Sequence, residues 1–469
     1  MYRGGNLIPL RKSTETTETE TPGLTKSYLK SYKLIMYDIT KTTAPKMPKL
    51  GKGTECIKLI ASQISPDMRE AIIPMVFPAL GAYISGSEFQ YPDLSWKEIC
   101  GQMAHLIADS GMGKGQLTIC IEALMRKFRQ HDEEELQKLV SWQKTVKTKA
   151  ANKEKPARPD VAFFFPPSDV TNPAFLQNAM ACETCGAHTQ YYNMTEIEMA
   201  DRMCGGHRQV SQTIHNIYDR QRAGALRATA DGVTGNPTLR VNITFSSTPF
   251  AARRFYKNEL YIGTFGRIPF SFKARHERSG RIPRHGKYPD EFFHKLDDYI
   301  VRLEACKGRF IIPQLNKLAD KLAQDMAAIA DLADDDVLWD MGKRAIVSAW
   351  KNGCILYVLN GQCWTRAIGD LVEWMVYHDL WSKMQVFGDM LKGGDTSTSD
   401  AGKTGPKNML DNLRDSFNEA ELEALRVSID KPKEGTKRQL RVWMSRGFIE
   451  YSEQTGLYSK TQVYLNRTR

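Results

Sequence analysis

The residues best suited to chemistry lie in one glycine-rich stretch, residues 109–116, which reads Asp-Ser-Gly-Met-Gly-Lys-Gly-Gln. A short apolar run, residues 103–108, precedes it, and apolar residues at helical spacing follow it. A strand, a glycine-rich turn and a helix in this order are the context in which backbone amides surround a phosphate. We therefore expect a nucleotide-binding loop made by Ser110, Gly111, Met112, Gly113, Lys114, Gly115 and Gln116.

The residue types in this loop suggest separate tasks. Gly111 and Gly113 allow the backbone to curl around an anion, and Lys114 supplies a positive charge for the outer phosphates of ATP. The following helix offers its positive end. Ala108 stands where such loops usually have a glycine, and Gly115 stands where a hydroxyl usually holds Mg²⁺. The alternative is a flexible glycine turn between a strand and a helix.

A second candidate is the stretch of residues 188–198, an extended segment that ends in acidic residues. An ATPase needs one carboxylate to hold Mg²⁺ and another to orient the attacking water, at the end of a neighbouring strand. We assign water activation to Glu196 and the metal to Glu196 and Glu198, while Thr195 occupies a position where Asp is usual. The expected cofactors are ATP and Mg²⁺. The alternative is the acidic start of a surface helix.

Two further strands are expected in the same sheet. Residues 161–165 form a short β-prone run that predicts a buried second strand. Residues 240–249 alternate and end in the hydroxyls of Ser246, Ser247 and Thr248, which we place between the phosphates and Glu196. Hydroxyls at the end of a strand can also simply cap a turn.

Arginines and cysteines supply two more hypotheses. Arg267, in a turn flanked by glycines, is our candidate for an arginine finger that reaches a neighbouring subunit, with Arg253 and Arg254 as rivals. A surface arginine is the alternative. Zinc-like half-spacings occur at residues 182–185 and 204–207, but we favour a helix end and an irregular turn; the possible ligands are Cys182, Cys185, Cys204 and His207.

The order of these parts resembles a family of P-loop ATPases of unknown function, found in replication proteins of plasmids, phages and conjugative or integrated elements. Residues 108–114, 168–173, 194–201, 244–249 and 266–272 carry the resemblance. It implies a RecA-like or helicase-like motor that works beside a primase or other replication proteins. It also implies Lys114 for phosphate, Glu196 for water activation and Arg267 for the contact between subunits.

The elements that must position these residues divide the chain into six parts. We predict a lead-in low in apolar residues, a pair of N-terminal helices, the ATPase core, a helical extension, a linker and a winged helix. Their bounds are 1–52, 53–100, 101–287, 288–391, 392–407 and 408–469.

The winged helix is predicted from its helix signals. Asn418 is expected to cap one helix and Thr436 another, and Gly447 is expected to end the second. In such a fold the second helix enters the major groove of DNA, and Lys437, Arg438 and Arg441 would make the contacts. Winged helices also serve as protein-docking modules, and that alternative stays open.

Composition limits the function classes. The 469 residues carry a net charge of +11, which favours a polyanionic partner such as DNA. Nine cysteines in a chain of this length indicate reduced thiols in a cytoplasm, and no apolar run is long enough for a membrane span. We expect a DNA-associated ATPase that assembles as a homo-oligomeric ring, possibly a hexamer, of a mobile element. The alternative is a DNA-binding regulator or scaffold whose loop does not hydrolyse ATP, and a zinc-stabilised structural protein is a third hypothesis.

Overall fold

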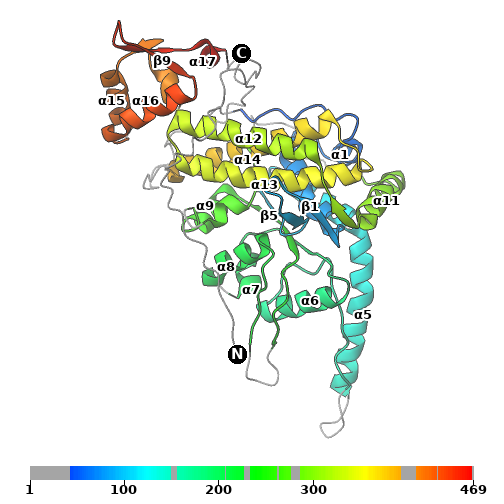
Figure 1. Cartoon of the computed structure of the whole chain (residues 1–469). Helices are drawn as coiled ribbons and strands as arrows, with labels where there is room; N and C mark the ends of the chain where they lie inside the picture. The colour runs from blue at the N-terminus through cyan, green and yellow to red at the C-terminus, as the bar shows by residue number, and fades with distance from the viewer. Residues whose placement is uncertain are drawn as a thin grey trace, which may run out of the picture.

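The computed structural model describes residues 43–148, 156–205, 207–226, 233–260, 263–275, 286–391, 408–429 and 431–466. They form a mixed α/β body with a parallel sheet, a layer of long helices and a small C-terminal unit (Figure 1). The predicted linker and most of the predicted lead-in lie outside the described residues, as does the side chain of His207. Within the described part of the chain, no helix combines the length and apolar character needed to cross a lipid bilayer.

The central sheet has four parallel strands in the order β4-β5-β3-β6. Every residue of β3 and β5 is buried, as expected for parallel strands covered on both faces. β5 lies between the strand that leads into the glycine-rich loop and the strand that precedes Glu196, as the sequence predicted. The strand bounds are β3 (Met103–Ala108), β4 (Gln190–Met194), β5 (Val241–Ser247) and β6 (Phe270–Lys273).

Alternate side chains of β5 show which elements cover the two faces of the sheet. On one face Asn242 Nδ2 donates to the carbonyl of Pro78 at 2.9 Å, within the N-terminal helices. On the other face Ser247 Oγ lies 2.8 Å from Nε2 of His105, whose Nδ1 lies 3.1 Å from the hydroxyl of Tyr256 in α9 (Pro249–Tyr256). Burial lowers the pKa of His105 to about 3, so this histidine is a neutral core residue. The N-terminal helices are α1 (Glu55–Ser62), α2 (Arg69–Ile72), η2 (Ile73–Val76) and α3 (Phe77–Ala82).

Side chains, and not a further strand, satisfy the backbone beside β4. The predicted strand at residues 161–165 is not formed, although the amide of Tyr191 in β4 donates to the carbonyl of Phe164 at 2.8 Å. The buried carboxylate of Asp132 accepts the amides of Phe164 and Phe165 at 2.8 and 2.7 Å. The amide of Asn178 pairs with both backbone groups of Phe163. This prediction was wrong because these side chains take the hydrogen bonds that a strand ladder would use.

The opposite edge of the sheet, β6, is closed by helix α14 (Arg366–Leu391). The carboxylate of Asp379 accepts the amide of Phe270 at 2.7 Å, and Ser382 Oγ accepts the amide of Phe272 at 3.0 Å. A strand edge with free amides invites pairing with another chain. Both edges of this sheet are therefore covered by side chains from helices or irregular segments.

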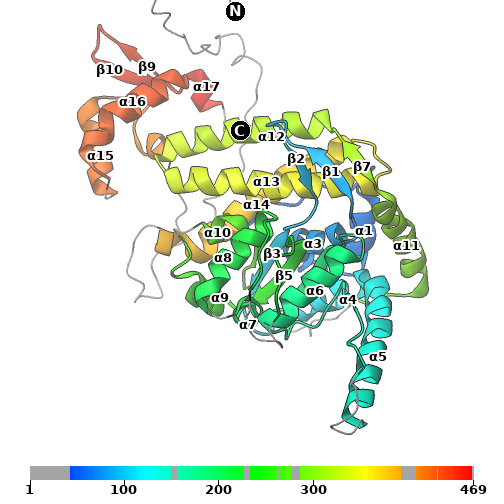
Figure 2. The ribbon, with the colours of Figure 1, turned by 60° about the horizontal axis from the view of Figure 1, so that its bottom comes forward.

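Helices surround the sheet and extend from it. Figure 2 shows α5 projecting from the body as an arm, while α6, α7 and α8 gather around β5. The bounds are α4 (Gly115–Leu124), α5 (Arg126–Thr148), α6 (Asn172–Thr184), α7 (Met199–Cys204), α8 (His207–Tyr218) and α10 (Thr264–Arg267).

The helical extension shares a sheet and a core with the N-terminal part of the chain. Its helices, predicted by their periodicity, are α11 (Asp290–Ala305), α12 (Pro313–Ala333), α13 (Asp336–Leu359) and α14. A three-stranded sheet joins β2 (Trp96–Glu98), β1 (Ser87–Gln90) and β7 (Gly308–Phe310), and the rings of Phe89 and Phe310 stack at 5.2 Å. The sequence predicted helices alone in residues 53–100 because these strands are too short to show periodicity. One hydrophobic cluster runs from Cys56 to Met390, so the predicted parts 53–100, 101–287 and 288–391 pack as one body.

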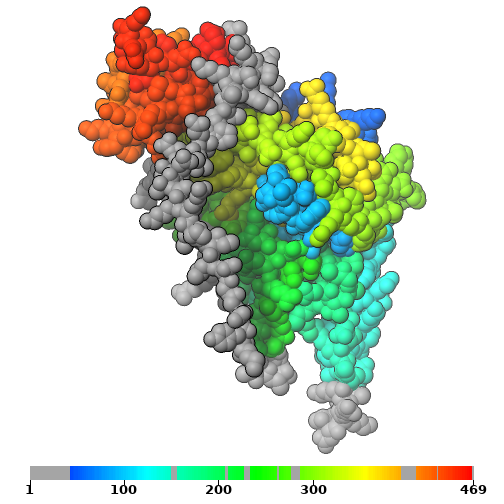
Figure 3. Space-filling model, in the orientation of Figure 1, coloured from blue at the N-terminus to red at the C-terminus, as the bar shows by residue number. Residues whose placement is uncertain are grey.

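The C-terminal unit has a small core of its own, to which α12 contributes Ala328 and Leu332. Figure 3 shows this unit in orange and red at one end of the helical layer. Asn418 caps α15 in a reciprocal capping box with Glu421, as its sequence predicted. The antiparallel sheet of the C-terminal unit has the strand order β8-β10-β9. The bounds are η3 (Met409–Asn412), β8 (Ser416–Phe417), α15 (Glu419–Ser428), η4 (Lys433–Gly435), α16 (Thr436–Ser445), β9 (Ile449–Ser452), β10 (Leu457–Lys460) and α17 (Gln462–Leu465).

Candidate functional site

The glycine-rich loop (residues 109–114) joins β3 to α4, which confirms the predicted order of strand, loop and helix. Gly111 and Gly113 have φ angles of +79° and +92°, in the region that favours glycine. A Cβ atom at Gly113 would lie 3.1 Å from Nε2 of Gln116, whereas one at Gly111 would meet open space. The two glycines are therefore required by the backbone, and Gly113 also by its neighbour.

Lys114 turns back over its own loop. Its Nζ donates to the carbonyls of Ala108 at 2.7 Å and Asp109 at 3.1 Å. Burial lowers the pKa of Lys114, while the carboxylates of Glu196 and Asp109 act in the opposite direction. The ammonium group therefore lies within electrostatic reach of Glu196, as the predicted site requires.

Gln116 anchors the loop and does not point into it. Its side chain is buried, with Oε1 accepting the amide of Ser65 at 3.0 Å and Nε2 donating to Ser65 Oγ at 2.9 Å. The predicted nucleotide contact of this side chain is therefore replaced by a structural contact with the N-terminal helices. Ser110, Gly111 and Gly115 are exposed, and Met112 is half-buried.

Glu196 is exposed just beyond the carboxyl end of β4, and the glycine-rich loop follows the carboxyl end of the parallel strand β3. Ser246, at the end of the intervening strand, donates from Oγ to the carbonyl of Thr195 at 3.1 Å. The neighbouring hydroxyls serve the fold, since Ser247 binds His105 and Thr248 caps α9. Of the three predicted hydroxyls, Ser246 is the one that reaches the Glu196 segment.

The residues around the loop offer few ligands to a magnesium ion. Mg²⁺ prefers oxygen ligands, usually one or two carboxylates. Gly115 has no side chain to offer, and Thr195 supplies a neutral hydroxyl. The carboxylate of Glu198, a predicted metal ligand, is bound to Arg254 at 2.5 Å. Glu196 and Asp109, which lies in the loop itself, remain as carboxylates, and across the described residues no three His, Cys, Asp or Glu side chains are grouped to hold a metal.

The zinc alternative does not gain support from the cysteines. Cys182 and Cys204 are buried while Cys185 is exposed. Burial raises the pKa of the Cys182 thiol, and burial likewise raises the pKa of Cys204 to about 12. Zinc is bound by thiolates, so both thiols behave as buried core groups.

Arg267 is turned into its own chain. Its side chain is 16% exposed, with Nη1 donating to the carbonyl of Gly263 at 3.1 Å and Nη2 3.2 Å from Asp219. It precedes β6 and therefore lies at the amino ends of the parallel strands, whereas the glycine-rich loop lies at their carboxyl ends. An arginine finger presents a free guanidinium, so Arg267 would have to leave Asp219 to reach a neighbouring subunit, and that contact stays a prediction.

The two rival arginines differ from each other. Arg253 is held by Asp389 at 2.5 Å and by the carbonyl of Val386 at 2.7 Å, so it is a structural residue. Arg254 has a side chain that is 64% exposed, and its partner is Glu198. Arg254 is therefore the arginine of the three that is presented to solvent.

One functional candidate was missed by the sequence reasoning. Arg275 follows β6, and its Nε lies 3.4 Å from Oδ2 of Asp109 in the glycine-rich loop. The signal lies in the sheet register, because β6 runs parallel to β3 with Lys273 opposite Ala108. Chain that follows β6 must therefore leave the sheet beside the loop, but residues 270–273 were not recognised as a strand.

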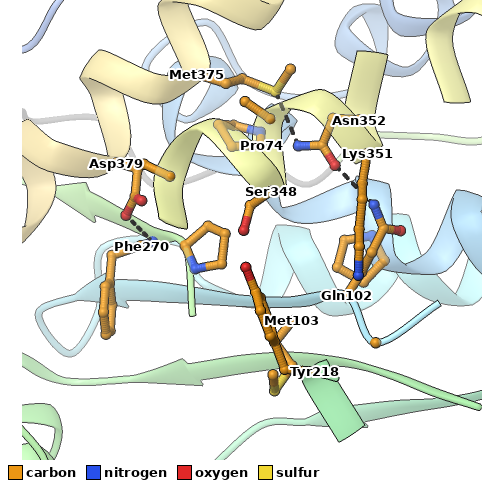
Figure 4. A pocket seen from close by; sticks show the side chains of 15 residues that line it. Pro74, Gln102, Met103, Tyr218, Phe270, Ser348, Lys351, Asn352, Met375 and Asp379 are labelled. Carbon is orange, nitrogen blue, oxygen red and sulfur yellow. Dashed lines mark hydrogen bonds between the residues drawn. The ribbon is translucent and has the colours of Figure 1, made fainter. Parts of the chain in front are cut away.

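A small hollow at the amino ends of β3 and β6 serves packing (Figure 4). It has room for little more than one water molecule, about 20 Å³. Nζ of the buried Lys351 donates to the carbonyl of Cys100 at 2.7 Å, and the side-chain amides of Gln102 and Asn352 pair at 3.1 Å. These contacts lie inside the body, at the amino ends of the strands and remote from the glycine-rich loop, and they leave Oε1 of Gln102 buried without a hydrogen-bond partner among the described residues.

Helix α16 separates a buried face from a basic one. Gln439, Leu440 and Trp443 are buried. The residues predicted to contact DNA are all exposed on the remaining surface, namely Lys437, Arg438 and Arg441. The helix is fixed to α12 by Arg446, whose Nε lies 2.7 Å from the carboxylate of Asp331.

No protein-family model matches this sequence, and no curated protein matches it.

Proposed function

We propose that the protein is a DNA-associated ATPase, a helicase-like motor in the replication or mobilisation of a mobile genetic element. The observation that supports this most strongly is that Lys114 and Glu196 both follow the carboxyl ends of strands of the same parallel sheet. A cation in a glycine-rich loop and a carboxylate beyond the neighbouring strands are the groups that phosphoryl transfer to water needs.

The finer fold assignment belongs to the same proposal. The support for a RecA-like core is the strand order β4-β5-β3-β6, in which β5 separates the loop strand from the strand of Glu196. The support for a winged helix is the combination of α15, α16 and a three-stranded antiparallel sheet. Its basic helix face and the net charge of +11 favour DNA as the partner.

The proposed chemistry uses the protein's own side chains. Lys114 and the loop amides hold the phosphates, and Glu196 orients a water molecule towards the terminal phosphorus. The oxygen of water forms a bond to phosphorus as the bond to the leaving diphosphate breaks, and ADP and phosphate result. Any metal ion enters with the nucleotide, as part of the substrate.

The test is ATP hydrolysis measured without DNA, with single-stranded DNA and with duplex DNA. We expect DNA to stimulate turnover, and both Lys114→Ala and Glu196→Gln to abolish the stimulated rate. Lys114→Ala should also weaken nucleotide binding, whereas Glu196→Gln should retain it, because only the lysine contacts the bound phosphates. Arg202→Ala is a control, since this exposed arginine is paired with Asp169 and lies outside the glycine-rich loop. Wild-type protein that binds DNA and ATP without turnover would refute the motor.

A second candidate is a DNA-binding regulator or scaffold that uses nucleotide as a switch. Three observations favour it: Gly115 lacks a hydroxyl, Thr195 replaces a carboxylate, and Arg267 is paired with Asp219 in its own chain. This candidate predicts that ATP changes DNA affinity without being hydrolysed. Fluorescence anisotropy of labelled DNA, with and without ATP, distinguishes it from the motor.

Assembly into a homo-oligomeric ring, and work beside a primase or other replication proteins, remain predictions. Light scattering after size-exclusion chromatography, with and without ATP, tests the ring. A monomer under both conditions, in protein that still hydrolyses ATP, would exclude a mechanism that needs an arginine from a neighbouring subunit.

A further inference from the structure

The glycine-rich loop has a second cation beside it. β6 and β3 are parallel, and their register places Lys273 opposite Ala108, the last residue before the loop. Arg275 lies two residues further along, with its Nε 3.4 Å from Oδ2 of Asp109. The sheet therefore delivers an arginine to the loop for the same reason that it delivers Lys114, since both follow the carboxyl ends of adjacent parallel strands.

The contact between Arg275 and Asp109 is one that a phosphate can replace. The side chain of Arg275 is 71% exposed and that of Asp109 is 39% exposed. Ion pairs this open to solvent contribute little stability. A phosphate group offers the guanidinium a more highly charged acceptor and bidentate geometry. Asp109 thus holds the arginine at the loop without binding it tightly.

Several residues around the loop are not available to bind a phosphate or a metal ion, which leaves the task to charged side chains. The first turn of α4 begins with Gly115, and the following side chain, Gln116, is bound to Ser65. Across the loop, Thr195 is uncharged and Glu198 is bound to Arg254. Lys114 and Arg275 are therefore the groups that can balance the charge of a polyphosphate, in a position where many such sites use a metal held by the protein.

We propose, on the basis of the proposed nucleotide-binding function, that Arg275 leaves Asp109 and binds the outer phosphates of a nucleoside triphosphate together with Lys114. The start of α4 offers no hydroxyl to a metal ion, because Gly115 stands there, so the affinity for nucleotide depends little on Mg²⁺. Asp109 opposes binding, because its carboxylate competes with the phosphates for the same guanidinium.

Equilibrium binding of a fluorescent ATP analogue, in excess Mg²⁺ and in excess EDTA, tests this inference. The wild-type dissociation constant should change by less than about threefold between the two conditions, since the hydroxyl that usually binds Mg²⁺ at the start of the helix is replaced by Gly115. Arg275→Ala should weaken binding about tenfold in both conditions, as expected for one charge-assisted contact. Arg275→Lys should lose less affinity for the analogue than Arg275→Ala. Asp109→Asn should bind the analogue as tightly as wild type or more tightly.

Two variants serve as controls. Arg202→Ala removes an arginine of similar exposure whose partner is Asp169, and it should leave affinity unchanged. Gly115→Ser restores a hydroxyl at the start of α4 and should make binding tighter in Mg²⁺ than in EDTA. Thermal unfolding of each variant shows whether it is folded.

The possible failures are distinguishable. A wild-type affinity that falls more than about tenfold in EDTA would overturn the inference about the metal. An Arg275→Ala variant that behaves like Arg202→Ala would overturn the role of Arg275. Wild-type protein that binds the analogue in neither condition would refute nucleotide binding itself, and with it the proposed function.

Discussion

At the scale of single residues, Gly113 carries two constraints and Gly111 carries one. Both have positive φ angles, but a Cβ atom at Gly113 would also crowd Gln116. We expect Gly113→Ala to lower the free energy of unfolding by more than the roughly 1–2 kcal/mol of a left-handed alanine, and Gly111→Ala to cost no more than this backbone strain.

Urea unfolding of the two glycine variants gives the comparison. Circular dichroism should report a lower midpoint for Gly113→Ala than for Gly111→Ala. Equal losses would mean that Gln116 yields freely and does not hold the loop in place.

The buried Lys351 should reduce stability at neutral pH. Burial lowers its pKa to about 8, and its Nζ is bound to the carbonyl of Cys100. Because the folded pKa lies below the unfolded value of 10.5, the unfolded state binds more protons between these two values, and stability from this group rises with pH there. Below pH 8 the burial of the charge costs on the order of 3 kcal/mol.

Comparison with Lys351→Met isolates this effect from other titrating groups. The variant should be more stable than wild type at pH 7. The gain should be smaller than the cost of burying the charge, because the variant also loses the hydrogen bond to the carbonyl of Cys100. Its advantage should shrink as the pH rises from 8 towards 10.5. A difference in unfolding free energy that is independent of pH would show that burial does not lower the pKa of Lys351.

The sequence is informative for residues whose role depends on near neighbours. The glycines, Lys114 and the capping pair of Asn418 and Glu421 all act within a few positions of the chain. Arg267 and Arg275 act through partners far away in sequence, Asp219 and Asp109. Exposure and pairing of such residues depend on the packing of distant elements, and one sequence does not reveal it.

At the scale of elements, Asp132 takes the place of a strand partner. Its carboxylate accepts two amides of the segment that lies against β4. Asp132→Ala would leave both amides buried and unpaired, and we expect the free energy of unfolding to fall by at least about 2 kcal/mol. Asp132→Asn keeps one acceptor oxygen and should lose less.

Hydrogen exchange locates the effect of Asp132. The amides of Phe164 and Phe165 should exchange faster in Asp132→Ala, while the amide of Ile243 in β5 should exchange as in wild type after correction for global stability. Unchanged protection at Phe164 would show that other contacts hold the segment.

The prediction of elements failed where the hydrogen bonds come from far away. The run Val161–Phe165 has the composition of a strand, yet Asp132 and Asn178 bind its backbone. Strands β1 and β7 are short and pair with each other, although in the sequence β1 precedes all four strands of the central sheet and β7 follows them. Strands β3 and β5 were predictable because long apolar or β-branched runs are buried along their whole length.

At the scale of the whole molecule, the proposal of DNA binding makes the C-terminal unit the basic attachment point. Combined replacement of Lys437, Arg438 and Arg441 by alanine should weaken DNA binding. It should also reduce the slope of log affinity against log salt by about 0.9 for each phosphate that the variant no longer neutralises. Fluorescence anisotropy at several salt concentrations measures both quantities.

Lys295→Ala is the control for this experiment. Lys295 is exposed on α11 and paired with Glu291, in the helical layer and outside the C-terminal unit. It should leave the slope unchanged. A triple variant that keeps the wild-type slope would favour protein docking as the role of the unit.

The closure of the sheet edge by α14 has a consequence for the order in which the protein is made. Asp379 and Ser382, which accept the outward amides of β6, emerge from the ribosome long after Phe270 and Phe272. Ser87 waits even longer for its partner, because its hydroxyl donates to the carbonyl of Cys306, 219 residues later in the chain. Until then the nascent chain carries an open strand edge, which is the surface that aggregation exploits. Successful synthesis therefore depends on the last long helix arriving before neighbouring nascent chains meet.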